Sequence, residues 1–140
     1  MPPLHMILVD DDHDDCFILT HVIKEVLPDS QLTCFHNCAT LVKYLENLNP
    51  DPDQCITPDL IFMDLNMPGV LGQECLKKIR GNEICRNIPI VIYSTASRPD
   101  IVEECYRLGA TSYIVKPSDT RQLKELLLAV VEKFVYKNLN

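Results

Sequence analysis

Four aspartates follow two short apolar segments of the sequence. Asp10, Asp11 and Asp12 come directly after residues 6–9, and Asp64 comes directly after residues 60–63. A four-residue apolar run between polar residues is typical of a strand that is buried on both faces of a sheet. If the two strands are neighbours in one parallel sheet, their C-terminal ends meet at the edge where such sheets bind ligands. The sequence therefore predicts that three or four carboxylates converge there.

Converging carboxylates need a counter-ion. Carboxylates that lie close together raise one another's pKa, because each disfavours the charge of its neighbour. A hard divalent cation with oxygen ligands neutralises them, and magnesium suits this donor set best. We therefore expect a Mg²⁺ site that handles phosphate. For Asp12, Asp14 and Asp15 a second interpretation stays open, in which they cap the N-terminus of the helix that follows.

Two further apolar segments also end in residues that suit phosphate chemistry. Ser94 and Thr95 follow residues 90–93, and Lys116 follows residues 113–115. In phosphoryl transfer, acids hold the metal and one acid is the nucleophile, while hydroxyl and ammonium groups take up phosphoryl oxygens. Each of these residue types alone is common in loops, so the prediction depends on their convergence.

Five short apolar runs alternate with five segments of helical periodicity. The runs are 6–9, 32–35, 60–63, 90–93 and 113–115, and the periodic segments are 16–26, 41–48, 71–79, 101–108 and 123–134. This alternation predicts an α/β fold, a doubly wound parallel sheet covered by helices on both faces. Pro28 and Gly109 mark helix ends, and Ser97 with Asp100 resembles a capping box for the fourth helix. The loop at 47–58 has no role that we can assign.

Composition narrows the class of protein. A length of 140 residues fits one domain, and the net charge of −7 argues against nucleic acid as a partner. The apolar runs are too short to span a membrane, and the N-terminus lacks the features of a signal peptide. Seven cysteines without a CxxC pair argue against a disulfide framework and favour a reducing cytoplasm. We interpret Cys34 and Cys38 as small buried residues rather than zinc ligands.

Three motifs together resemble the receiver domains of two-component response regulators. They are residues 7–12 (ILVDDD), 64–69 (DLNMPG) and 109–117 (GATSYIVKP), and the resemblance extends from about His5 to Phe134. It implies a five-stranded sheet of the flavodoxin-like order 2-1-3-4-5. We expect a single receiver domain over residues 1–140, with its core at about 5–136 and no output domain.

The resemblance also implies a role for each site residue. Asp64 would accept a phosphoryl group from the phosphohistidine of a sensor histidine kinase or a histidine phosphotransfer protein. Asp11, Asp64 and the backbone carbonyl of Asn66 would hold magnesium directly, and Asp10 would hold it through water. Lys116 would pair with the aspartyl phosphate, aimed by a cis peptide bond to Pro117.

In such a domain the phosphate acts as a switch. The rotamer of Tyr113 would report the phosphorylation state, and the surface between the fourth helix and the fifth strand would bind a downstream protein target that the sequence does not name. The chain would catalyse only its own phosphorylation and dephosphorylation, so we do not expect an enzyme that transforms a metabolite.

Two neighbouring hydroxyls compete for the switch position on the fourth strand. The motif favours Thr95, because Thr95-Ala96 resembles the pair that often ends this strand in receivers. The spacing favours Ser94, which lies 30 residues after Asp64 and 22 before Lys116. Side chains alternate along a strand, so only one of the two can aim at the phosphate. We weight spacing over motif and predict Ser94.

The chain departs from the family pattern at two places, and two other functions compete. Ser118 stands where phenylalanine is common, and the loop at 47–58 is longer than in many relatives. A magnesium-dependent phosphatase with an aspartate nucleophile is the alternative, but it needs an acid two residues after Asp64, where this chain has Asn66. A degenerate receiver that only binds partners is disfavoured by the intact set of Asp10, Asp11, Asp64 and Lys116.

Overall fold

The computed structural model describes residues 2–48, 57–67 and 69–139. Its five strands form one sheet in the order β2-β1-β3-β4-β5, with every neighbouring pair parallel. The predicted flavodoxin-like order is therefore confirmed. The strands are β1 (His5–Val9), β2 (Gln31–Phe35), β3 (Leu60–Met63), β4 (Ile90–Ser94) and β5 (Ser112–Val115).

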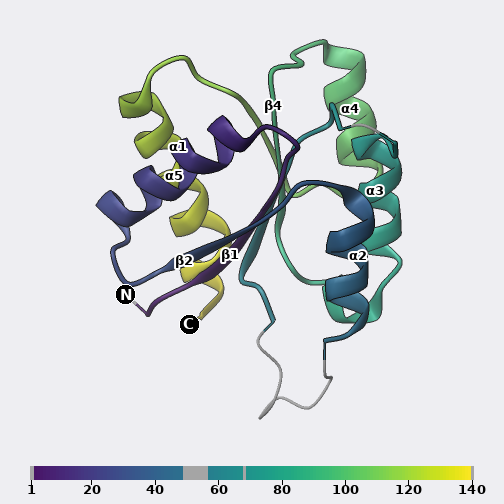
Figure 1. The fold of residues 1–140 in the computed structure, drawn as a ribbon, viewed down its shortest axis with the longest axis horizontal. Coiled ribbons are helices and arrows are strands. Elements are labelled where there is room, and N and C mark those ends of the chain that lie inside the picture. The colour runs from purple at the N-terminus through teal and green to yellow at the C-terminus, as the bar shows by residue number, and fades with distance from the viewer. Residues whose placement is uncertain (1, 49–56, 68, 140) are drawn as a thin grey trace.

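The helices cover both faces of this sheet. Figure 1 shows α1 and α5 on one side and α2, α3 and α4 on the other. Their bounds are α1 (His13–Val26), α2 (Cys38–Glu46), α3 (Gly72–Arg80), α4 (Pro99–Arg107) and α5 (Thr120–Phe134), with short 3₁₀ helices η1 (Glu83–Cys85) and η2 (Tyr136–Leu139). Of the helices in the described ranges, none is both long enough and apolar enough to cross a lipid bilayer.

The central strands are apolar without interruption because both of their faces are covered. Met6 and Leu8 of β1 pack into the core beneath α1 and α5, whereas Ile7 and Val9 pack into the core beneath α2 and α3. All four side chains are fully buried. A strand with water on one face would instead alternate apolar and polar residues. Because of this two-sided burial, the acidic residues Asp10 and Asp64 come directly after the last residues of β1 and β3.

The helix ends agree with the sequence at most positions. Asp12 is the N-cap of α1, where its side chain accepts a hydrogen bond from the Asp14 N–H. Gly109 follows α4 with a φ of +110°, a conformation that favours glycine. The predicted capping box at Ser97 is wrong, because α4 begins at Pro99 with Arg98 as its N-cap and without a side-chain cap. Proline suits the first position of a helix that lacks a side-chain cap, because its φ is already helical and it has no N–H that needs an acceptor.

The expectation of unpaired cysteines is also wrong in this structure. Disulfides join Cys16 of α1 to Cys34 of β2, and Cys38 of α2 to Cys75 of α3. The partners are 18 and 37 residues apart, with Cα–Cα distances of 6.4 and 5.8 Å. Packing of neighbouring elements brings each pair together, and spacing along the sequence does not reveal it. Cys34 and Cys38 therefore have different partners and form no metal pair.

Candidate functional site

Three of the predicted aspartates converge at the C-terminal edge of the sheet. One carboxylate oxygen from each of Asp10, Asp11 and Asp64 lies within 4.8 Å of the others. The register explains this, because Val9 pairs with Met63 and the residues after them therefore lie side by side. The Asp64 N–H donates to the Val9 carbonyl at 3.0 Å, which fixes the two strand ends together. Asp10 and Asp64 are 1% and 4% exposed, and Asp11 is exposed.

One oxygen of Asp64 has no hydrogen-bond partner among the described residues. Its Oδ1 is buried and accepts no hydrogen bond from them, and the Lys116 Nζ stands 3.8 Å away. A buried carboxylate oxygen without a partner is costly, so this atom is suited to receive a cation or to react. Three carboxylates of which two are buried are also the donor set that a hard divalent cation prefers. The residues present therefore fit a magnesium ion.

The backbone after Asp64 lies closely against the start of α3. A Cβ on Gly72 would stand 2.8 Å from the Asp64 carbonyl oxygen and 2.5 Å from the Leu65 Cα, so only glycine fits there. The Gly72 N–H also donates to the Leu65 carbonyl at 3.1 Å. Asn66, the predicted source of a carbonyl ligand, is exposed in the same loop. Gly72 thus fixes the segment that carries both Asp64 and Asn66, a role that the sequence did not suggest.

Asp10 joins the aspartates to the lysine. Its Oδ1 accepts from the Asp12 N–H at 2.9 Å and its Oδ2 accepts from the Lys116 Nζ at 2.8 Å. Burial raises the pKa of Asp10 to about 6, although these two hydrogen bonds oppose the rise. The site is therefore desolvated enough to disfavour an additional negative charge unless a cation is present.

Lys116 is held at the end of β5 by carboxylates from two elements. Its Nζ donates to Asp10 and also to Asp15 Oδ2, at 2.7 Å. The same nitrogen lies 5.3 Å from the centroid of the Tyr93 ring. Burial alone would lower the pKa of Lys116, but the hydrogen bonds to Asp10 and Asp15 outweigh it and raise the pKa. The two carboxylates therefore favour the charged form of the ammonium group.

The expected cis peptide bond between Lys116 and Pro117 is wrong. No peptide bond of the described residues is cis, so the bond from Lys116 to Pro117 is trans. Trans is the intrinsically preferred isomer of bonds that precede proline. Lys116 reaches both of its carboxylate partners with this isomer.

Ser94 and Thr95 differ sharply in burial. Ser94 is 0% exposed and its Oγ accepts from the Ala96 N–H at 3.2 Å, whereas Thr95 is exposed. Tyr113 is half-buried, and its hydroxyl donates to the Ala96 carbonyl at 2.6 Å. Burial raises the pKa of Tyr113, and its contact with Ser94 acts in the opposite direction. The structure thus brings Ser94 and Tyr113 together around Ala96 and leaves Thr95 outside.

A known protein family matches most of the chain. The family model of the response regulator receiver domain matches residues 6–128. The chain belongs to this family. The matched range contains all the site residues named above, from Asp10 to Lys116.

Two similar proteins are response regulators. The two-component response regulator ARR15 of Arabidopsis thaliana is 32% identical over 134 residues, which are 91% of this chain and 64% of ARR15. The response regulator Rcp1 of Synechocystis is 30% identical over 135 residues, which are 95% of this chain and 89% of Rcp1. The chain thus spans just under two thirds of ARR15 but most of Rcp1.

The solved structures show the same fold. The Mn²⁺-bound form of Rcp1 superimposes with a TM-score of 0.78 at 25% identity over 96% of each chain. The phosphorylated cyanobacterial phytochrome response regulator RcpA gives a TM-score of 0.81 at 24% identity, covering 95% of this chain and 94% of RcpA. At that identity the likeness to RcpA shows the fold alone.

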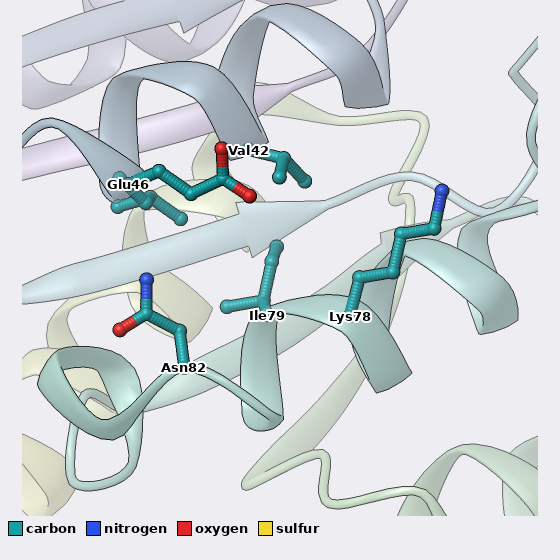
Figure 2. Close-up of a pocket in the computed structure, with 6 residues that line it drawn as sticks. Val42, Glu46, Lys78, Ile79 and Asn82 are labelled. Carbon is teal, nitrogen blue, oxygen red and sulfur yellow. The ribbon is translucent and has the colours of Figure 1, made fainter.

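A cavity elsewhere in the receiver domain does not compete with this site. A cavity of about 30 Å³ lies between α2 and α3. Figure 2 shows residues that line it. Its lining residues are Val42, Leu45, Glu46, Lys78, Ile79 and Asn82, none of which belongs to the aspartate cluster. A space of this size holds one or two water molecules. It is therefore a packing gap between helices and not a binding site for a substrate.

Proposed function

We propose that this receiver domain is a phosphorylation-dependent switch or phosphorelay intermediate in which Asp64 accepts the phosphoryl group. The observation that carries the proposal is the buried Asp64 Oδ1, which lies beside two further carboxylates and an ammonium group and accepts no hydrogen bond within the part of the chain that the structure describes. The donor would be the phosphohistidine of a sensor histidine kinase or of a histidine phosphotransfer protein. The chain would act on itself alone and transform no metabolite.

Asp11 and Asp64 would hold a magnesium ion directly and Asp10 would hold it through water, with the carbonyl of Asn66 as a further direct ligand. The ion would supply positive charge that neutralises the carboxylates and the incoming phosphoryl oxygens. This neutralisation matters because burial already disfavours the charge of Asp10. Without it, a dianionic group would enter a cluster that repels anions.

In the transfer, an Asp64 carboxylate oxygen forms a bond to phosphorus while the bond from phosphorus to the histidine nitrogen breaks. The nitrogen keeps the electron pair and takes up a proton from solvent. Lys116 pairs with the phosphoryl oxygens through charge-assisted hydrogen bonds. The product carries more negative charge than the carboxylate and three strong acceptor oxygens, which give the switch its signal.

The signal would leave the site through Ser94 and Tyr113. Ser94 would turn its hydroxyl from the Ala96 N–H to a phosphoryl oxygen, and Tyr113 would then repack from its bond with the Ala96 carbonyl. Both changes alter the surface of α4 and β5, where Tyr106 and Val115 are large exposed hydrophobic residues. That surface would bind the downstream protein target.

We propose the cytoplasm as the compartment of this exchange. There, thiol reductants would open the two disulfides of this structure, Cys16–Cys34 and Cys38–Cys75. The phosphatase alternative remains less suitable, because the exposed Asn66 stands where that chemistry needs an acid.

The test is phosphorylation by a small donor. Incubation with acetyl phosphate and Mg²⁺ should add one phosphate per chain, measured by intact mass, and Asp64→Asn should abolish the addition. Asp100→Asn is the matched control, because Asp100 is exposed on α4 and its carboxylate pairs with Arg98. Labelling of Asp64→Asn at the level of the control would contradict the assignment.

A further inference from the structure

Lys116 has a carboxylate partner that lies outside the aspartate cluster. Its Nζ stands 2.7 Å from Asp15 Oδ2 and 2.8 Å from Asp10 Oδ2, but 3.8 Å from Asp64 Oδ1. Hydrogen bonds of this kind require about 3.2 Å or less between heavy atoms. In this structure the ammonium group is therefore committed to Asp10 and Asp15 and not to Asp64.

The contact with Asp15 is stronger than an ordinary surface ion pair. The Lys116 side chain is 11% exposed and the Asp15 side chain is 23% exposed, so water screens the pair only partly. The buried Tyr93 ring lies 5.3 Å from the same ammonium nitrogen and adds a favourable cation–π contact. Asp15, Tyr93 and Lys116 also line one cavity of about 70 Å³. Asp15 and the Tyr93 ring together stabilise the Lys116 ammonium group in this position.

Position on the helix explains why Asp15 reaches the lysine. The N-cap at Asp12 starts α1, and Asp15 lies three residues later in the first turn. Asp14 lies in the same turn but is exposed. Asp14 and Asp15 are therefore adjacent in the sequence and carry the same charge. Of these two, Asp15 is the one that pairs with Lys116.

We propose that Asp15 is a positioning residue that retains Lys116 in the unphosphorylated protein and competes with the phosphoryl group on Asp64 for the ammonium group. This inference rests on the proposed role of Asp64 as phosphoacceptor. When Lys116 moves to the phosphoryl oxygens, it gives up its bond to Asp15, and the link between α1 and the end of β5 is released. Asp15 thus weakens the phosphorylated state relative to the resting state.

Beryllofluoride binding in the presence of Mg²⁺ measures this competition, because beryllofluoride on a carboxylate mimics the aspartyl phosphate. Asp15→Asn should bind it about fivefold more tightly than wild type, the factor that corresponds to the removal of a competing ion pair of about 1 kcal/mol. Asp14→Asn should bind it as wild type does, although it removes the same charge. Asp15→Glu, which keeps the charge, should return the affinity towards wild type.

A second measurement tests the contact without any phosphate chemistry. Proton exchange of the Lys116 ammonium group, followed by NMR in the ligand-free protein, should be several-fold faster in Asp15→Asn than in wild type or Asp14→Asn. Melting curves of the three proteins check that each is folded.

The outcomes separate this inference from the proposed function. Equal or weaker beryllofluoride binding by Asp15→Asn would overturn the competition, and unchanged Lys116 exchange would overturn the resting contact. Absence of beryllofluoride binding by wild type would contradict the proposed function itself, whatever the exchange of Lys116 shows.

Discussion

Two half-buried cations, Arg80 and Lys116, are used in opposite ways in this receiver domain. Arg80 donates to neutral acceptors: the carbonyls of Gly109, Cys85, Arg86 and Ile88 at 2.8, 2.9, 3.3 and 2.7 Å, and the Thr111 hydroxyl at 3.1 Å. Lys116 donates to the carboxylates of Asp10 and Asp15. Accordingly, burial lowers the pKa of Arg80, whereas the carboxylates raise the pKa of Lys116.

The two cations therefore make two kinds of contact. We call the hydrogen bonds of Arg80 the fixed contacts and the ion pairs of Lys116 with Asp10 and Asp15 the exchangeable contacts. Four of the five acceptors of Arg80 are backbone carbonyls of η1, the segment before β4 and the loop after α4, and the fifth is the Thr111 hydroxyl. These acceptors are uncharged, so a metal ion competes for them less than for carboxylates. The partners of Lys116 are side-chain carboxylates, so an anion can compete for the ammonium group and a metal ion can compete for the carboxylates. Buried polar groups with neutral, fully used partners rigidify a fold, whereas groups with an unsatisfied neighbour such as Asp64 mark a site of change.

The largest expected effect comes from removing each cation. Arg80→Met leaves several carbonyls without a donor and should lower the free energy of unfolding by about 3 kcal/mol or more. Added Mg²⁺ should not restore this loss beyond its effect on wild type. Lys116→Met leaves carboxylates that a metal ion can neutralise, so Mg²⁺ should stabilise this variant more than wild type. Urea unfolding with Mg²⁺ and with EDTA measures both, and equal Mg²⁺ effects in the two variants would remove the distinction.

A second change tests the fixed contacts of Arg80 at one of its acceptor residues, Gly109. Gly109 has a φ of +110°, and a Cβ there would stand 2.9 Å from the Arg80 Cγ. Gly109→Ala combines backbone strain with that contact and should cost about 1–3 kcal/mol of stability. Gly81→Ala is the control, because a Cβ there meets atoms no nearer than 3.4 Å. Equal stability of the two variants would show that the loop after α4 is not fixed by Arg80.

A third change tests the predicted metal ligands next to the exchangeable contacts of Lys116. Asp11→Ala should lose most of the rise in melting temperature that Mg²⁺ gives, because binding to the folded state alone produces that rise. Without Mg²⁺ it should melt no lower than wild type, since one like charge has been removed from the cluster. Asp12→Ala removes a helix cap and should keep the Mg²⁺ effect. Equal Mg²⁺ shifts in the two variants would show that the assignment of ligands is wrong.

The smallest expected effect is a pH dependence of the free energy of unfolding, which comes from Asp10 in the exchangeable contacts. Asp10 has a pKa of about 6 in the folded protein against an ordinary value of 3.8, so the folded state holds its proton more tightly. Its contribution to stability is therefore fully present below pH 3.8 and is lost as pH rises through 6. Without metal, the stability of wild type relative to Asp10→Asn should fall over this window. A difference that rises instead would contradict the desolvation of Asp10.

Sequence patterns predicted the sheet better than the helix starts. Each apolar run lies within an observed strand and differs from it by at most one residue, because the central strands are covered on both faces. Most of the periodic segments begin about one turn too late, since first turns such as residues 13–15 consist of polar residues that follow the N-cap. The proline-rich part of the loop at 47–58 lies outside the described residues.

The convergence of Asp10, Asp11 and Asp64 was also predictable, because it follows from two strand ends and parallel pairing. Asp15, Gly72 and the two disulfides were not predicted. Their contacts depend on how α1, α2 and α3 pack, and no spacing along the chain encodes those distances.

The structure of the complex with Mg²⁺ and beryllofluoride tests the central claim most directly. We predict beryllofluoride on the Asp64 carboxylate, the Mg²⁺ ion held by Asp10, Asp11 and Asp64, the Lys116 Nζ moved from Asp15 to a fluorine, and the Ser94 hydroxyl on another fluorine. Beryllofluoride absent from Asp64, or a Lys116 that remains on Asp15, would contradict the account, and Thr95 on the fluorine would transfer the switch role from Ser94.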